Sequence, residues 1–149
     1  CPRRRYKFQQ ETMKKVVYIL IAMALFTACD RVYINGVLDG MWRLESVVYP
    51  DSTAHPEQIF YSFQRHMTQV SEHNDSASAK RFLGNLYYDG TTLTMSHFYK
   101  FPGEEYTATI DMLKVFHLHS DSTVFRVLSL DDELLIMKNE ERTYTLRKW

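Results

Sequence analysis

The stretch FLGNLYYDGTTLTMSHF, residues 82–98, carries the clearest structural signal in the chain. Two runs rich in aromatic and aliphatic residues, 82–88 and 92–98, flank the pair Asp89-Gly90. An Asp-Gly pair between such runs is typical of a β-hairpin, because the turns that match the twist of antiparallel strands need positive φ angles. The sequence therefore predicts two antiparallel strands joined at Asp89-Gly90.

Runs of the same character occur on both sides of this hairpin. They predict six further strands, at 41–49, 58–64, 66–72, 123–130, 133–138 and 142–148. Abundant Tyr, Phe, Thr and Val favour strands over helices. The segment 55–70 is open to a helical alternative, since its predicted turn at Gln64-Arg65 contains no Gly, Pro, Asn or Asp.

The lengths of the connections indicate how the strands are arranged. The links at 50–57, 73–81 and 99–122 are long, whereas those after residues 64, 88 and 130 are tight. In an up-and-down meander, successive links lie at alternate ends, so the long links share one end, the mouth, and the tight turns close the other. An even strand number lets the last strand pair antiparallel with the first. We predict an all-β fold, an eight-stranded antiparallel up-and-down barrel whose interior fills with side chains or holds one small ligand.

One helix is predicted within the long link 99–122. Ile110, Leu113 and Phe116 recur on one side of a helical segment at 109–116, with Thr109 as its N-cap and Asp111 in its first turn. At the mouth this helix would be either a plug that completes the core or a lid over a ligand. The plug is favoured, because so short a helix needs tertiary burial to form.

The segment MKKVVYILIAMALFTACD, residues 13–30, predicts a secretory signal. Two lysines precede thirteen uncharged, mostly apolar residues, 16–28. This run is shorter than the roughly 20 residues that cross a bilayer and fits the apolar region of a signal peptide, about 7–15 residues. Thr27-Ala28-Cys29 resembles the lipobox of bacterial lipoproteins, which implies acylation of Cys29 after cleavage before it. An ordinary cleaved signal and an uncleaved anchor are the alternatives.

These features divide the chain into four parts. We expect translation to start at Met13, so that residues 1–12 are upstream or added residues and 13–28 are the signal peptide. Residues 29–39 would form a tether, and 40–149 the barrel. Residues 1–28 hold six of the 18 basic and one of the 18 acidic residues, which gives the chain from Cys29 a net charge of −5. This charge argues against nucleic acid as a partner, and against a polybasic membrane patch.

Two short motifs give a resemblance to a known family. Gly40-Met41-Trp42 matches the G-x-W motif that opens the first strand of lipocalins. Lipocalins also carry an Arg near the end of the last strand that packs over this Trp at the closed end, which implies a Trp42–Arg147 pair. The order of Cys29, a short tether, G-x-W and a final Tyr144-Thr145-Leu146-Arg147-Lys148 resembles the short lipocalin-like lipoproteins of Bacteroidetes. The resemblance implies a lipid-anchored protein of the bacterial envelope. Since Asp30-Arg31 is not an acidic export signal, we expect it to face the periplasm.

The sequence contains no catalytic signature. Nucleophile motifs and phosphate-binding Gly-rich loops are absent, so we expect no enzyme activity and no cofactor. His117-Leu118-His119 is the only spacing typical of a metal site, but no third ligand is identifiable, so surface histidines are favoured and no metal is predicted.

Three functions remain open. They are binding of a small hydrophobic or amphipathic ligand, a non-catalytic interaction domain with a filled barrel and, more distantly, a metal-assisted enzyme. For the first, the strand directions place a ligand site at the mouth, with Tyr61 and His97 as its polar contacts. The predicted lining residues are Val48, Ile59, Tyr61, Leu83 and His97, with Ile110, Leu113 and Phe116 above them.

Overall fold

The computed structural model describes residues 10, 13–21, 33–74, 79–100 and 107–149. The chain divides into two compact units, residues 1–32 and Tyr33–Trp149. In the first unit, residues 13–21 are helical with exposed side chains. Among the described residues, no helix has both the length and the apolar character to cross a membrane. Cys29, the predicted acylation site, lies outside the described residues.

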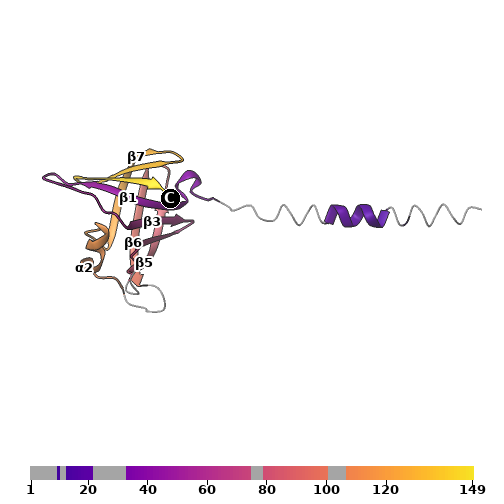
Figure 1. Cartoon of the computed structure of the whole chain (residues 1–149), viewed down its shortest axis with the longest axis horizontal. Helices are drawn as coiled ribbons and strands as arrows, with labels where there is room; N and C mark the ends of the chain where they lie inside the picture. The colour runs from indigo at the N-terminus through magenta and orange to yellow at the C-terminus, as the bar shows by residue number, and fades with distance from the viewer. Residues whose placement is uncertain (1–9, 11–12, 22–32, 75–78, 101–106) are drawn as a thin grey trace, which may run out of the picture. The chain divides into compact units, whose positions relative to one another are not determined.

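The second unit is an antiparallel barrel (Figure 1). Each long strand pairs with the next along the chain, and the last pairs with the first, which closes the sheet. A two-residue strand, β2 (Thr53–Ala54), extends the edge of β1. The predicted eight-stranded barrel is therefore confirmed. Its long strands are β1 (Gly40–Val48), β3 (Ile59–Gln64), β4 (Met67–Glu72), β5 (Arg81–Tyr88), β6 (Thr92–Lys100), β7 (Ser122–Leu130), β8 (Leu134–Asn139) and β9 (Arg142–Lys148).

The helical alternative for residues 55–70 is wrong. This segment forms most of the β3–β4 hairpin, in which Gln64 pairs with Met67 across a two-residue turn. Arg65 adopts a φ of 56° in that turn, a conformation that non-glycine residues seldom take. The hairpin forms because Ile59, Tyr61 and Phe63 alternate into the barrel core. Burial of these three side chains outweighs the strained conformation of Arg65.

The closed end is capped by a short segment that the sequence assigned to the tether. The 3-10 helix η1 (Gly36–Leu38) buries Leu38 completely, and the Leu38 carbonyl accepts a hydrogen bond of 2.8 Å from Trp42 Nε1. The compact unit thus begins at Tyr33, before the G-x-W motif.

Lys148, and not Arg147, covers Trp42. The Lys148 Nζ lies 4.3 Å from the Trp42 ring centroid and donates to the carbonyl oxygens of Val37 at 2.7 Å and Asp39 at 2.6 Å. Because side chains alternate along a strand, Lys148 shares the inward face with Tyr144 and Leu146, while Arg147 points outward to Glu45 at 3.0 Å. The predicted Trp42–Arg147 pair is therefore corrected to Trp42–Lys148.

Gly40 makes room for this lysine. Its φ of 133° is open to few residues other than glycine, and a Cβ built there would lie 2.9 Å from Lys148 Cε. The glycine of the G-x-W motif thus serves the closed end, through both its backbone conformation and the close approach of the lysine.

A short helical segment at the mouth confirms the helix predicted after the β5–β6 hairpin. The α-helix α2 (Ile110–Leu113) continues as the 3-10 helix η2 (Lys114–Phe116). Thr109 Oγ1 accepts from the Met112 backbone N–H at 3.4 Å, as expected of an N-cap, and Asp111 pairs with Lys114 at 2.8 Å. The segment follows β6, which ends at the mouth, and α2 is labelled in Figure 1.

Candidate functional site at the mouth of the barrel

The helical segment of α2 and η2 plugs the mouth, because its apolar side chains pack into the barrel core. Leu113 and Phe116 have no exposed surface, and the Phe116 ring meets the Phe82 ring edge to face at a centroid distance of 5.7 Å. Tyr61 on β3 donates its hydroxyl hydrogen to the Phe116 carbonyl at 2.5 Å, and Tyr144 on β9 donates to the His117 carbonyl at 2.7 Å. Two tyrosines from different strands therefore hold the backbone of this segment, as expected of a plug and not of a lid.

Only half of the eight residues predicted to line a ligand site come together, and these four are packed in the core. Ile59, Tyr61, Leu113 and Phe116 share the hydrophobic core. Val48 and Ile110 are more than two-fifths exposed, while Leu83 and His97 lie on the outer side of the barrel wall.

Leu83 points outward by the regular alternation of β5, in which Phe82, Gly84 and Leu86 face inward, whereas His97 points outward because β6 contains a bulge in its pairing with β5. The register shifts between Leu83 and Asn85, where Gly84 and Phe98 occupy the inward positions. His97 has a φ of 54°, which places its side chain out of the simple alternation. Period-two alternation alone could not locate this shift.

A polar cluster lies instead around Tyr49, directly after β1. The Tyr49 hydroxyl is 2.7 Å from His117 Nδ1 and 3.4 Å from His119 Nε2. The guanidinium carbon of Arg142, at the start of β9, lies 5.8 Å from the centroid of the Tyr49 ring. His117 ends η2 in the left-handed conformation, with a φ of 60°, and this turn directs both histidines toward Tyr49. We call Tyr49, His117, His119 and Arg142 the mouth cluster.

The protonation states of the mouth cluster follow from its partial burial. Burial raises the pKa of Tyr49 above its usual value, although Arg142 opposes this shift. Burial, followed by the neighbouring His119, lowers the pKa of His117, and burial together with Arg142 and Lys114 lowers that of His119. At neutral pH the imidazoles are therefore uncharged, the Tyr49 hydroxyl can donate to His117 Nδ1, and Arg142 supplies the permanent charge of the cluster.

The arrangement suits hydrogen bonding better than metal binding. Within the described ranges, no three His, Cys, Asp or Glu side chains are close enough together to hold a metal ion. The spacing His117-x-His119 predicts surface histidines, whereas both side chains are partly buried and face the Tyr49 hydroxyl. What the sequence could not show is Tyr49, which lies 68 residues from His117 and meets it only because the barrel closes.

Two hollows of about 380 Å³ each lie on the outside of the barrel. One is lined by Arg43, Glu45, His55, Pro56 and Glu57. The other lies at the closed end, beside η1 and the tight turns, and is lined by Ile34, Asn35, His66, Tyr87, Tyr88, Asp89 and Gly90.

Comparison with known proteins gives one family and two similar structures. The pattern of a family described as lipocalin-like domain matches residues 24–149. A lipocalin-like protein from Bacteroides uniformis superposes with a TM-score of 0.61 at 20% identity, covering 76% of this chain and 100% of that one. An uncharacterized protein from Bacteroides eggerthii superposes with a TM-score of 0.59 at 20% identity, covering 75% and 99%. At this identity the two structures show a shared fold alone. No curated protein matches the chain.

Proposed function

Because the chain belongs to the lipocalin-like domain family, we propose that it is a non-catalytic, lipid-anchored protein of the bacterial envelope, facing the periplasm, that binds a small amphipathic molecule at the mouth of its barrel. The mouth cluster is the observation that carries this proposal. The ligand lies over the plug and not deep in the barrel, because the protein's own side chains occupy the interior.

The charge and donors of the cluster favour an acidic head group. Arg142 is half-buried, and within the described residues it forms no ion pair with an acidic side chain. A guanidinium binds a carboxylate or phosphate through two parallel hydrogen bonds. The neutral imidazoles and the Tyr49 hydroxyl add hydrogen-bonding groups beside it. In a chain with net negative charge after residue 28, this local cation provides specificity for an anion.

Exposed apolar side chains near the mouth would receive the ligand's tail. Val48 pairs with Thr143, the residue after Arg142, and is 43% exposed. Ile110 and Met112 on α2 are exposed to a similar degree. A charged group beside separate apolar side chains fits an amphipathic molecule better than a wholly apolar one.

The lipid anchor rests on the sequence. Lys14, Lys15, the apolar run and Thr27-Ala28-Cys29 are the observations that support acylation of Cys29. Metabolic labelling with an alkyne fatty acid should mark the wild type and leave the Cys29→Ser variant unmarked. Equal labelling of both proteins would remove the anchor from the proposal.

Fluorescence titration with a dansyl-labelled medium-chain fatty acid tests binding at the mouth. We expect the probe to bind the wild type saturably. For Arg142→Gln its dissociation constant should rise about tenfold or more, since a hydrogen bond to a charged group contributes about 1.5–3 kcal/mol. Arg126→Gln, an exposed arginine of β7, is the matched control and should bind normally. The methyl ester of the probe should bind poorly, because it lacks the anionic group.

An interaction domain with a filled barrel is the second candidate. The observation that favours it is the buried interior, in which Tyr61, Phe116, Phe125 and Tyr144 occupy the space of a ligand. A wild type that binds neither the probe nor any small molecule from its host's lysate would leave this candidate.

A further inference from the structure

Large apolar and aromatic side chains are exposed together at the closed end. Each is between 42% and 64% exposed, although small-domain surfaces usually distribute such residues singly. We call them the closed-end patch: Tyr33, Ile34, Val37, Met67 and Tyr87.

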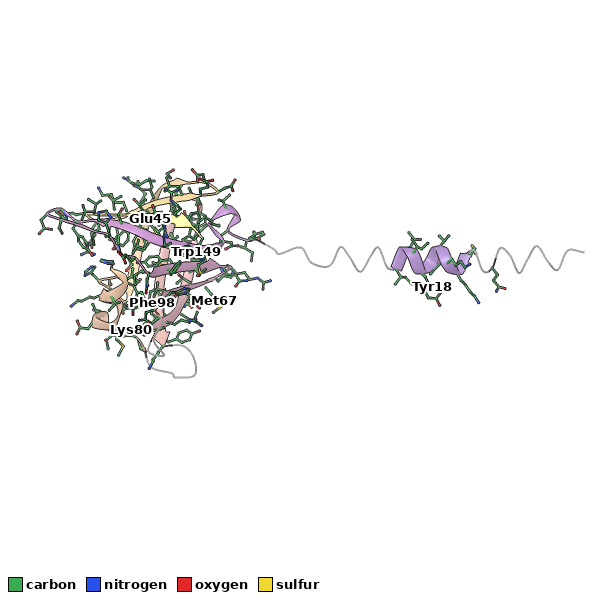
Figure 2. All side chains as sticks on the ribbon, viewed as in Figure 1. Tyr18, Glu45, Met67, Lys80, Phe98 and Trp149 are labelled. Carbon is green, nitrogen blue, oxygen red and sulfur yellow. The ribbon has the colours of Figure 1, made fainter. Side chains whose placement is uncertain are left out.

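Specific contacts bring Ile34, Met67 and Tyr87 to one end of the domain, and Tyr33 and Val37 belong to the same short segment as Ile34. The Asn35 side chain donates to the Arg65 carbonyl at 2.7 Å, which holds the segment before η1 against the β3–β4 turn. Ile34 and Tyr87 line the same hollow, beside His66. Met67 begins β4 and pairs with Asn85, two residues before Tyr87 on β5. Met67 is labelled at the surface of the domain in Figure 2.

The position of Cys29 in the sequence would bring the anchoring membrane close to the closed-end patch. Only three residues separate Cys29 from Tyr33. An extended chain spans at most about 3.5 Å per residue, so an acyl group on Cys29 would keep Tyr33 within about 14 Å of the lipid. This step rests on the lipid anchor of the proposed function.

We propose that the closed-end patch docks on the surface of the anchoring membrane, so that the mouth points away from it. Tyrosine rings are favoured at membrane–water interfaces, where the ring contacts the acyl boundary and the hydroxyl stays hydrated. Ile34, Val37 and Met67 add exposed apolar side chains at the same end. The anchor and the patch act as two weak membrane signals on one domain, and together they hold it more firmly than either alone.

The charges at this end set the orientation. Arg65 and His66 lie beside the patch, whereas Asp131, Asp132 and Glu133 occupy the β7–β8 turn at the same end of the barrel. Anionic lipid would repel that turn, so the domain tilts toward the β3–β6 side. Because charges of both signs lie at this end, docking depends on the apolar patch and does not require anionic lipid.

A fluorescent label at position 87 tests the docking in the lipidated protein. The chain has two cysteines, Cys1 before the predicted cleavage site and Cys29, whose sulfur would carry the lipid. Tyr87→Cys then provides the only free thiol for an environment-sensitive dye. Val124→Cys is the matched control, because Val124 is 54% exposed on the outer face of β7 near the mouth. Each protein is reconstituted in phosphatidylcholine–phosphatidylethanolamine vesicles containing a nitroxide-labelled lipid.

We expect the nitroxide to quench most of the emission at position 87 and to leave position 124 unchanged. Adding Ile34→Ser and Val37→Ser should at least halve the quenching at 87, whereas Leu128→Ser, on the outer face of β7, should not alter it. In protein whose Cys29 is acylated, equal quenching at 87 and 124, or none at 87, would overturn the proposal. So would emission at 87 that depends on protein concentration and not on lipid, which would identify a contact between copies.

A second tether separates failure of docking from failure of the anchor. Mass spectrometry of the protein reports whether Cys29 is acylated. If it is not, a hexahistidine tag placed before position 29 of the Cys29→Ser variant binds the chain to nickel-chelating lipid at the same point, and the labels are read again. Quenching at 87 but not at 124 supports docking without acylation, and its absence in this arrangement refutes docking whatever the mass shows.

Discussion

Replacing Phe116 with alanine should cost about 3–5 kcal/mol of unfolding free energy, the usual loss for a large aromatic side chain in a core. Phe116 has no exposed surface, packs edge to face on Phe82, and its backbone carbonyl is held by the Tyr61 hydroxyl. The truncation leaves the hydrogen bond to the carbonyl in place, so the loss reports packing alone. With a urea dependence of about 1–3 kcal/mol per molar for a small domain, the unfolding midpoint should fall by about 2 M.

Ile110→Ala is the control for this experiment. Ile110 belongs to the same helical segment but is 46% exposed, so its truncation should cost less than about 1 kcal/mol. Urea unfolding followed by tryptophan fluorescence measures both variants, because Trp42 is completely buried. If Phe116→Ala is no more destabilising than Ile110→Ala, the segment is a loosely held lid and the plug is refuted.

Three further predictions concern other parts of the domain. Lys148→Ala should destabilise the domain by about 1–3 kcal/mol, because the Val37 and Asp39 carbonyls lose their donor. Arg147→Ala removes only an exposed ion pair, worth at most about 1 kcal/mol. Equal losses of unfolding free energy in urea would show that Lys148 does not stabilise the closed end. Gly84→Ala should cost about 1–3 kcal/mol, since the new Cβ would lie 2.9 Å from both the Phe98 ring and a backbone oxygen; a melting temperature equal to that of the wild type would contradict this. The pKa of His117 is lowered in the folded state. The stability that the neutral imidazole contributes is therefore complete above the pKa of an unfolded histidine, about 6.5, and is lost as the pH falls through the folded pKa. Urea midpoints between pH 7.5 and pH 5 should therefore fall more steeply for the wild type than for His117→Asn, which keeps a residue tolerant of the left-handed turn; parallel slopes would exclude this role.

Sequence patterns were sufficient for the barrel because burial on one face of each strand imposes a period of two. Trp42, Leu44, Tyr144 and Leu146 show that period directly, and Asp89-Gly90 marks a hairpin turn. Link lengths then placed the mouth, since long and tight connections alternate along a meander.

Features that depend on irregular geometry could not be predicted in this way. The bulge opposite Gly84 reversed the expected side of His97. The Trp42–Arg147 pair was implied by the family resemblance alone, and the regular alternation of β9 places Lys148 over Trp42 instead. The mouth cluster joins Tyr49 to His117 across 68 residues, and no local pattern records that contact.

NMR spectra of the six histidine imidazoles during titration with decanoic acid test the central claim, that an acidic amphipathic molecule binds at the mouth cluster. We predict that the His117 and His119 resonances shift together and saturate at one concentration, while those of His55 and His66, on the outside of the barrel, stay in place. The same titration of Arg142→Gln should need about tenfold more acid, consistent with the loss of one charged hydrogen-bonding group. Unchanged His117 and His119 resonances in the folded wild type would contradict the account.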